Sequence, residues 1–176
     1  MAEKRDNIVL IGFMGSGKST TGINLSYRLQ CVLTDTDKVI EKKEGRSISE
    51  IFAAEGEEYF REKETELLKK LREERTRQIF SVGGGTPLRA ENRKLLRELG
   101  TVVYLKVSPK TVCERLRGDT TRPLLQGENP MEKIRTLLDE REELYREAAD
   151  IIVETDGKKP AQITEEIAAL LKGENS

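Results

Sequence analysis

The feature that most constrains this chain is a glycine-rich stretch between an apolar run and a helical pattern. Residues 12–19, GFMGSGKS, match the pattern G-x-x-x-x-G-K-[ST]. The apolar run Ile8–Ile11 precedes them, and a helical stretch that ends near Gln30 follows. Strand, glycine turn and helix in this order form a loop whose backbone N–H groups surround a phosphate. The pattern therefore predicts a nucleotide site within an α/β fold.

The residue types of this loop fit a bound nucleoside triphosphate. Glycines let the main chain wrap a phosphate without side-chain clashes, and the following helix directs its positive N-terminal end at the same anion. We expect Lys18 to reach the β- and γ-phosphates and the Ser19 hydroxyl to ligate Mg²⁺. The alternative is a glycine turn that only links strand to helix, which a complete motif with both flanks in register disfavours. The predicted ATP-binding residues of the loop are Gly12, Met14, Gly15, Ser16, Gly17, Lys18, Ser19 and Thr20.

Short apolar runs alternate with charged, helix-period stretches along the chain. The predicted strands are Ile8–Ile11, Cys31–Thr34, Gln78–Val82, Thr101–Val107 and Ile151–Glu154. They are rich in β-branched residues and apolar on both faces, as a buried parallel sheet requires. The alternation predicts an α/β fold with a parallel sheet. Ser47 and Ser108 are predicted helix N-caps, and Gly100 and Gly173 are predicted left-handed caps at helix C-termini.

Composition narrows the chemistry further. The 176 residues predict one domain. With 31 Lys+Arg against 32 Asp+Glu, the formal charge of −1 predicts neither a nucleic-acid nor a membrane partner. The absence of histidine removes Ser-His, Cys-His and metal-histidine chemistry. Cys31 and Cys113 form no disulfide framework and the N-terminal residues resemble no signal peptide, so we expect a cytoplasmic protein.

Two carboxylates follow the second predicted strand, in Asp35-Thr36-Asp37. Residues two apart in an extended segment point to the same side. Ligands of parallel α/β sheets bind beyond the carboxyl ends of the strands. The pair can therefore face the phosphate site, with one carboxylate near Mg²⁺ and the other near a hydroxyl acceptor. From spacing alone, an aspartate-rich loop that serves only turn and cap formation is an equal alternative.

Three further features are ambiguous from spacing alone. The consecutive glycines Gly83–Gly85 end the third predicted strand and indicate close approach of a ligand to the main chain, with a flexible turn as the alternative. Arg61 lies at the edge of an apolar stripe on a highly charged helix, where spacing favours a solvated arginine. Residues 118–127 interrupt the pattern as a surface loop. Arg122 in this loop either closes over a phosphoryl group as part of a lid or is an ordinary surface arginine.

Together these motifs resemble the shikimate kinase family. The shared segments, in the family's order and at compatible separations, are GFMGSGKST (12–20), DTD (35–37), GRSISEIFAAEGEEYFREKE (45–64), GGG (83–85), RPLL (122–125) and ERxxLY (140–145). The resemblance extends from about Ile8 to the last predicted helix. Many families share the phosphate loop, whereas the ordered combination of the other segments is much more specific.

The resemblance implies a nucleoside-monophosphate-kinase-like fold. It implies a single domain over residues 1–176, a five-stranded parallel sheet flanked by helices in three layers, a substrate-binding helical region near residues 37–75 and a mobile lid near residues 118–127. It further implies transfer of the γ-phosphate of ATP to the 3-hydroxyl of shikimate, on the route to chorismate and the aromatic amino acids. The family resemblance implies ATP as co-substrate, one Mg²⁺ per site and a monomer.

Substrate contacts also follow from the resemblance, position by position. Asp37 is expected to contact the ring hydroxyls, including the one that attacks the phosphate. Arg61 and Arg141 are expected to hold the shikimate carboxylate, while Gly83–Gly85 line the ring. Arginine suits this task because its planar guanidinium presents two parallel donors to a carboxylate.

The resemblance assigns the nucleotide side as well. Lys18 and Arg122 join Asp37 as catalytic residues, with Arg122 on the lid meeting ATP and the transferring phosphoryl group. Ser19 and Asp35 are expected to serve Mg²⁺, Asp35 largely through water. Adenine is expected to lie between Arg115 and Pro160. Phosphoryl transfer depends mainly on positioning and charge neutralisation, so a chain without histidine can perform it.

Mild departures from the family pattern and two other functions stay open at this point. Thr34 stands where a larger apolar residue is common, and Thr86-Pro87 stand where small apolar residues are more usual. One alternative function is a kinase of the same fold that acts on a sugar acid or a nucleotide. A gluconate kinase is expected to use a histidine-containing signature, and an adenylate kinase a proline in the glycine loop. The other alternative is a non-catalytic nucleotide-binding module, which is expected to lack one of the key charged residues.

Overall fold

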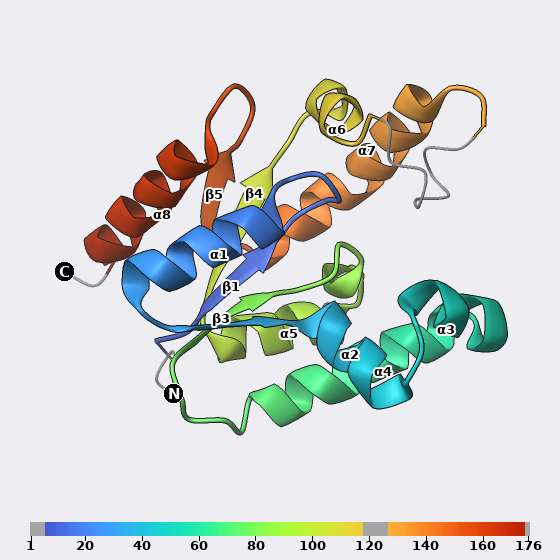
Figure 1. Ribbon diagram of the computed structural model, residues 1–176, viewed down its shortest axis with the longest axis horizontal. Helices are drawn as coiled ribbons and strands as arrows, with labels where there is room; N and C mark the ends of the chain where they lie inside the picture. Colours follow the sequence, from blue (N-terminus) through green and yellow to red (C-terminus); the bar gives the residue numbers. More distant parts are fainter. Residues whose placement is uncertain (1–5, 118–126, 175–176) are drawn as a thin grey trace.

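A five-stranded parallel sheet forms the centre of the computed structural model, which describes residues 6–117 and 127–174 (Figure 1). Its strands are β1 (Ile8–Ile11), β2 (Val32–Asp35), β3 (Gln78–Ser81), β4 (Thr101–Lys106) and β5 (Ile151–Glu154). The strands lie in the order β2-β3-β1-β4-β5. The five predicted strands are confirmed, with ends that differ by at most one residue. The order reverses direction at β1, so the carboxyl end of β1 is the switch point where ligands bind in such sheets.

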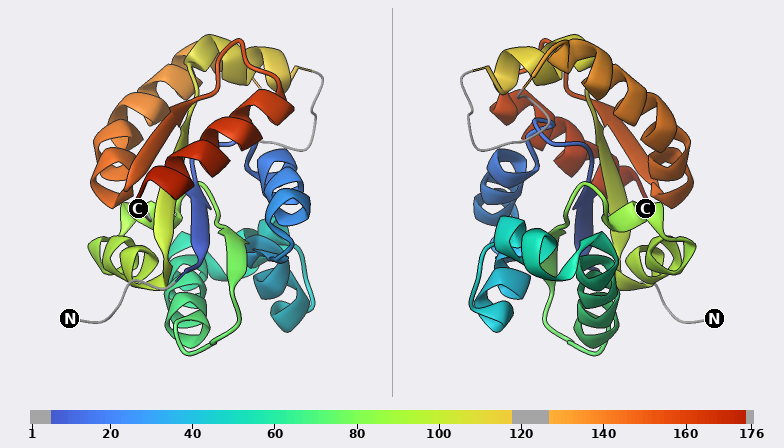
Figure 2. Two further views of the ribbon diagram at one scale, coloured as in Figure 1. Left: turned by 90° about the vertical axis from the view of Figure 1, so that its left-hand side faces the viewer. Right: turned by 90° about the vertical axis from the view of Figure 1, so that its right-hand side faces the viewer.

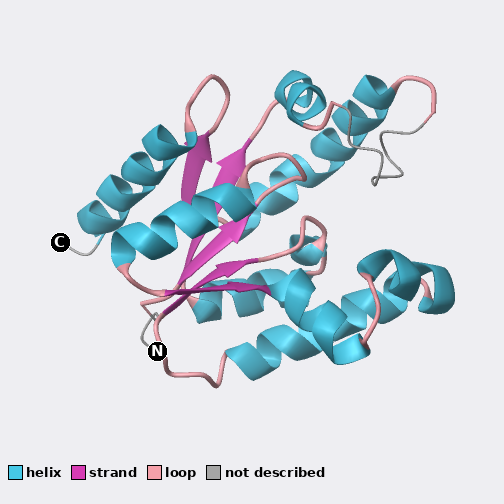
Figure 3. Ribbon diagram, in the orientation of Figure 1, coloured by secondary structure: helices cyan, strands magenta, loops and turns pink. Residues whose placement is uncertain are grey.

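Helices cover both faces of this sheet, which gives three layers (Figures 2 and 3). In chain order they are α1 (Lys18–Leu29), α2 (Thr36–Glu44), α3 (Ile48–Glu55), α4 (Glu57–Leu71), α5 (Ala90–Leu99), α6 (Pro109–Arg115), α7 (Pro130–Ala148) and α8 (Pro160–Glu174), with a short 3-10 helix, η1 (Thr86–Leu88), after β3. Helices α1 and α8 pack together on one face, whereas α4, α5 and α7 cover the other. Helices α2 and α3 lie beside α4 at the β2 end of the sheet.

The core divides at the sheet because side chains alternate between its faces. Val9 and Ile11 of β1 point into the larger cluster, which contains the apolar residues of α4, α5 and α7. Ile8 and Leu10 point into the smaller cluster under α1 and α8. All four side chains are at most 3% exposed, so β1 anchors both layers and holds the glycine-rich loop that follows it.

The two edge strands do not match the prediction that each strand is apolar and buried on both of its faces. Val32 of β2 is 59% exposed and Ile152 of β5 is 39% exposed. Each lies on a strand with only one neighbouring strand in the sheet. Residues on the inner strands β1, β3 and β4 are almost all buried, so the expectation holds only for the centre of the sheet.

Helix-end signals are partly confirmed. The Ser47 hydroxyl accepts a hydrogen bond from the Glu50 N–H at 3.1 Å, and Ser108 caps α6 in the same way through Thr111. The prediction of left-handed caps is wrong at both glycines. Gly100 has φ 173°, an extended conformation that any residue adopts, and Gly173 lies inside α8.

Gly100 is instead required for space. A β-carbon at this position would collide with the backbone carbonyl of Asn7, which accepts a hydrogen bond from the Thr101 N–H at 2.9 Å.

In the part of the chain that the structure describes, no helix has the length and apolar character needed to cross a membrane.

We predict that Gly100→Ala lowers the free energy of unfolding by about 1–3 kcal/mol, because the added methyl group overpacks a fixed backbone. Gly173→Ala is the matched control, since a β-carbon there meets nothing within 4 Å and alanine favours a helix by up to about 1 kcal/mol. Urea unfolding of both variants measures the difference. Equal stabilities for the two variants would contradict this account of Gly100.

Candidate active site

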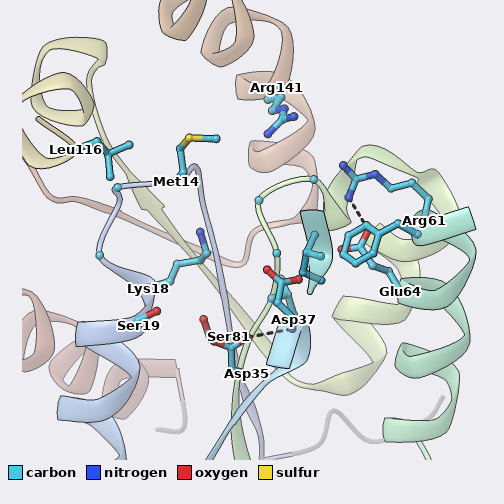
Figure 4. Close-up of a pocket in the computed structure, with 18 of the residues that line it drawn as sticks. Met14, Lys18, Ser19, Asp35, Asp37, Arg61, Glu64, Ser81, Leu116 and Arg141 are labelled. Atoms are coloured by element: carbon cyan, nitrogen blue, oxygen red, sulfur yellow. Dashed lines mark hydrogen bonds and ion pairs between the residues drawn. The ribbon is translucent and has the colours of Figure 1, made fainter. Parts of the chain in front are cut away.

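A pocket of about 420 Å³ opens at the carboxyl ends of β1, β2 and β3, where the sheet order reverses (Figure 4). The glycine-rich loop forms one side of it, and α4 and α7 contribute arginines to the other. Predicted site residues that line it are Met14, Gly15, Gly17, Lys18, Ser19, Thr20, Asp35, Asp37, Arg61, Gly83, Gly84, Gly85 and Arg141. The structure thus brings together residues from five separate segments of the chain.

The glycine-rich loop adopts the conformation that its motif predicts. Gly15 and Gly17 have φ angles of 77° and 91°, in the left-handed region where a side chain is strained. The Lys18 Nζ donates hydrogen bonds to the backbone carbonyls of Gly12 at 2.6 Å and Phe13 at 3.2 Å. The ammonium is thereby held over the loop, at the N-terminal end of α1 where an anion is favoured.

The two aspartates reach the pocket by a different geometry from the one predicted. Asp35 ends β2, but Asp37 lies in the first turn of α2 and not in an extended segment. Asp35 Oδ1 accepts hydrogen bonds from the N–H groups of Asp37 at 3.0 Å and Lys38 at 3.3 Å, and so caps α2. Asp35 therefore caps a helix as the alternative predicted, but both aspartates also line the pocket, as the interpretation of a paired carboxylate site requires.

Asp37 carries the most perturbed carboxylate of the site. Its Oδ1 is buried and has no hydrogen-bond partner among the described residues. Burial raises the pKa of Asp37 from its ordinary value of 3.8 to about 6, the nearby charges of Glu64 and Asp35 raise it as well, and Lys18 opposes them. The Asp37 side chain also lines the pocket, so its carboxylate is placed to meet a hydroxyl donor there.

The three consecutive glycines provide room for charged side chains. A β-carbon on Gly83 would lie 2.8 Å from Asp37 Oδ1 and 3.2 Å from Glu64 Oε2, and one on Gly85 would overlap the Arg61 guanidinium. Helix α7 also contacts this loop, because the Tyr145 hydroxyl donates a hydrogen bond to the Gly84 carbonyl at 2.6 Å. These contacts favour the close approach of the main chain to its neighbours over an unconstrained turn.

Arg61 is not the solvated arginine that spacing alone favours. Its side chain is 12% exposed, and its Nη1 lies 2.6 Å from Glu64 Oε1. Its Nη2 lies 3.3 Å from Glu57 at the rim. The guanidinium carbon is 5.5 Å from the centre of the Phe60 ring. Arg61 therefore enters the pocket with a fixed orientation, because α4 supplies its partners one turn away on either side.

Arg141 approaches from α7, across the pocket from the aspartates (Figure 4). Its guanidinium carbon is 5.6 Å from the centre of the Phe13 ring, and a β-carbon on Gly84 would lie 3.7 Å from its Nη1. Stacking on an aromatic face leaves the edge of a guanidinium open to donate hydrogen bonds. Arg61 and Arg141 thus bring two guanidinium groups to the pocket, with Arg141 beside Phe13 of the glycine-rich loop.

Sequence reasoning missed Glu64, which lines the pocket, and its buried partner Thr86. Glu64 is 2% exposed and links Arg61 to the hydroxyl of Thr86, which is 1% exposed. The spacing of three residues between Arg61 and Glu64 was the available signal, but charged neighbours at this spacing are common on α4. Thr86 entered only as a departure from the family pattern. The other departure, Thr34, is satisfied by a hydrogen bond from its hydroxyl to Gln78 Oε1 at 2.7 Å.

Other predicted residues lie outside the pocket lining. Arg115, at the end of α6, donates to the Gly15 carbonyl at 2.9 Å and to the Thr155 carbonyl at 3.0 Å. It thus joins the outer side of the phosphate loop to the segment before α8, which Pro160 begins. Gly12 and Ser16 belong to the loop interior, where a β-carbon on Gly12 would lie 2.8 Å from Ser16 Oγ. Arg122 and nearly all of the predicted lid lie outside the described residues.

The residues that the structure describes offer few side-chain ligands for a metal ion. Within residues 6–117 and 127–174, no group of three or more His, Cys, Asp or Glu could hold a metal ion. Mg²⁺ prefers oxygen ligands and is bound through one or two protein groups together with substrate phosphates. The Ser19 hydroxyl and the Asp35 carboxylate, which both line the pocket, match this donor set.

This sheet order, with a phosphate loop between β1 and α1 and a cationic pocket beside it, defines a P-loop kinase of small molecules. A sequence model of shikimate kinases matches residues 14–172. A shikimate kinase from Moorella thermoacetica is 47% identical over 166 residues, which cover 94% of each chain. The chain belongs to the shikimate kinase family.

Solved structures agree with this assignment. A shikimate kinase from Acinetobacter baumannii in complex with shikimate superposes with a TM-score of 0.89 at 38% identity, over 98% of this chain and 96% of that one. A gluconokinase from Sinorhizobium meliloti gives a TM-score of 0.56 at 16% identity, over 96% of this chain and 94% of that one. The second likeness reflects the shared fold alone.

We predict that Asp37→Asn changes the pH dependence of stability. A raised pKa means that ionising Asp37 disfavours the folded state, so wild type loses stability as the pH rises from about 4 through about 6. Asparagine does not ionise. Relative to wild type, the variant should therefore gain roughly 2–3 kcal/mol in unfolding free energy between pH 4 and pH 8. Urea unfolding at both pH values measures this, and a pH-independent difference would contradict the raised pKa.

Proposed function

We propose that this chain transfers the γ-phosphoryl group of ATP to the 3-hydroxyl of shikimate, giving shikimate 3-phosphate and ADP. The observation that carries the proposal is one pocket that joins a phosphate loop, a buried unpartnered carboxylate oxygen and two arginines. Each element matches one part of the reaction: the triphosphate, the attacking hydroxyl and the substrate carboxylate.

The nucleotide end is supported by the loop geometry. Lys18 rests on the carbonyls of Gly12 and Phe13, from which its ammonium can contact the β- and γ-phosphates. The Ser19 hydroxyl and, largely through water, Asp35 would hold one Mg²⁺ with the phosphates. That ion supplies neutralisation of the charge on the transferring group. Met14, Gly15, Ser16, Gly17 and Thr20 complete the proposed phosphate cradle.

The substrate end is supported by the two arginines. A small carboxylate needs planar cationic donors, and Arg61 and Arg141 face the pocket from different helices. The contact with Glu64 fixes Arg61 and leaves other N–H groups of its guanidinium to donate to a substrate. The glycines at 83–85 allow the substrate ring to approach the main chain.

Asp37 is proposed to act on the attacking hydroxyl. With a pKa of about 6 it is ionised above neutral pH, so its carboxylate, which lines the pocket, can accept the hydroxyl hydrogen. The hydroxyl oxygen then forms a bond to the γ-phosphorus as the bond to the ADP oxygen breaks, and the proton passes to Asp37. The expelled ADP takes the electron pair of the broken bond. Positioning and charge carry most of the catalysis in such transfers.

The remaining assignments are proposals that rest on the family resemblance. Arg115 and Pro160 would flank adenine, and the position of Arg115 beside Gly15 supports this. Arg122, on a lid near residues 118–127, would meet the transferring phosphoryl group. We propose further that residues 1–176 form one domain, with residues 37–75 as its substrate-binding region, and that the enzyme is a cytoplasmic monomer.

Purified protein with ATP and Mg²⁺ should release ADP when shikimate is added, and a coupled assay measures this release. Gluconate and AMP serve as control acceptors, because they match the sugar-acid and nucleotide alternatives. We expect turnover with shikimate at least 100-fold above either control. Turnover with gluconate or AMP and none with shikimate would overturn the proposed function.

Arg61→Ala should raise the shikimate KM by about 100-fold or more, since breaking a buried charge pair costs on the order of 3 kcal/mol. The ATP KM should change less than threefold. Arg89→Ala is the control, because Arg89 also pairs with glutamates of α4 but lies outside the pocket. Steady-state kinetics measures all three proteins. An unchanged shikimate KM in Arg61→Ala would exclude Arg61 from carboxylate binding.

A further inference from the structure

Behind the pocket, a chain of buried hydrogen bonds links Arg61 to α5. Arg61 Nη1 donates to Glu64 Oε1 at 2.6 Å, and the Thr86 hydroxyl donates to the other oxygen, Glu64 Oε2. The Thr86 carbonyl accepts from Asn92 Nδ2 at 2.9 Å. Thr65 completes the chain by donating to Asn92 Oδ1 at 2.7 Å. Glu64, Thr65, Thr86 and Asn92 are each at most 4% exposed.

The Glu64 carboxylate needs both of its donors. A buried carboxylate is costly unless its oxygens are hydrogen-bonded or paired with a charge. Arg61 serves one oxygen and Thr86 serves the other. Without the Thr86 hydroxyl, Oε2 would have no donor that the structure describes, and the carboxylate would gain by rotating toward Arg61. Such a rotation would draw guanidinium N–H groups away from the pocket.

Thr86 is itself held by rigid surroundings. Its N–H donates to the Gly83 carbonyl at 3.1 Å, which closes the turn after the glycines. Arg93 on α5 donates to the carbonyls of Pro87 and Leu88 at 2.9 and 3.1 Å, and so fixes η1 from the other side. These contacts hold the main chain of η1 on both sides, and with it the Cα atom of Thr86. Precise placement of a supporting group is what sets the geometry of a binding residue.

We propose that the Thr86 hydroxyl is a positioning group for substrate binding, acting through Glu64 to hold the Arg61 guanidinium open toward the substrate carboxylate. This inference rests on the proposed function. Under this inference Thr86, which departs from the usual family pattern, contributes to the affinity of this chain for shikimate. Thr86 is not among the residues that line the pocket, and its hydroxyl donates to the carboxylate that holds Arg61, so we expect its effect to fall on shikimate and not on ATP.

Two substitutions separate this role from simple packing. Thr86→Val keeps the volume and removes the hydroxyl, whereas Thr86→Ser keeps the hydroxyl and removes a methyl group. We expect Thr86→Val to raise the shikimate KM at least fivefold, with ATP KM and kcat within twofold of wild type. Thr86→Ser should stay within twofold of wild type for all three parameters. A packing role predicts the opposite ranking of the two variants, and that ranking would overturn the inference.

A double-mutant cycle tests whether Thr86 acts through Arg61. In the Arg61→Ala background, Thr86→Val should change the shikimate KM less than twofold, because no guanidinium is left to orient. A further fivefold rise in that background would overturn the inference. If Thr86→Val does not fold, Thr86→Ser and Thr86→Ala give the same comparison, since both lack the methyl group and only serine keeps the hydroxyl.

The outcomes also separate this inference from the function on which it rests. Wild-type protein that turns over no shikimate contradicts the proposed function. Wild-type protein that turns over shikimate, with equal KM values for Thr86→Val and Thr86→Ser, contradicts only the role of Thr86. Circular dichroism and urea unfolding of each variant establish that the KM values come from folded protein.

Discussion

The site depends on the space that the glycines at 83–85 leave at the carboxyl end of β3. A side chain at Gly83 would collide with Asp37, and one at Gly85 would collide with Arg61. Because the backbone lies so close, a carboxylate acceptor and a guanidinium donor can share one small pocket while their supporting partner stays buried. The Tyr145 hydroxyl and the η1 contacts hold this stretch in place. The main chain at residues 83–85 thus separates the Asp37 carboxylate from the Arg61 guanidinium in the substrate site.

The placement of the charged side chains in the site follows from this close approach of the main chain. Glu64 serves two purposes, since it orients Arg61 and, together with burial, raises the pKa of Asp37. At the other end, Lys18 and the N-terminal end of α1 offset the charge of a triphosphate. The reaction needs positioned charges more than a strong proton carrier, which accounts for a kinase that contains no histidine. The near-zero net charge of the chain conceals this local separation of charges.

Much of this arrangement was predictable from the sequence, and the failures have physical causes. The phosphate loop and the five strands were predictable because their signals are local: a glycine motif and β-branched runs. The geometry of Asp37 was not, since α2 begins inside the DTD segment through the Asp35 cap. Glu64 was missed because many charged residues of α4 have a charged neighbour one turn away, as Glu64 has in Arg61. Thr86 was missed because its partner Glu64 lies 22 residues away in the sequence. Gly100 was misinterpreted because a steric contact with Asn7, and not a backbone angle, requires glycine there.

The central claim is that one pocket holds a substrate carboxylate on Arg61 and Arg141 while Asp37 accepts a hydrogen bond from a ring hydroxyl. A crystal structure of the chain with shikimate and ADP tests it most directly. We predict carboxylate oxygens within about 3 Å of guanidinium nitrogens of both arginines, and a hydroxyl oxygen within about 3 Å of an Asp37 oxygen. Shikimate bound with its carboxylate away from both arginines, or with no hydroxyl near Asp37, would contradict the account.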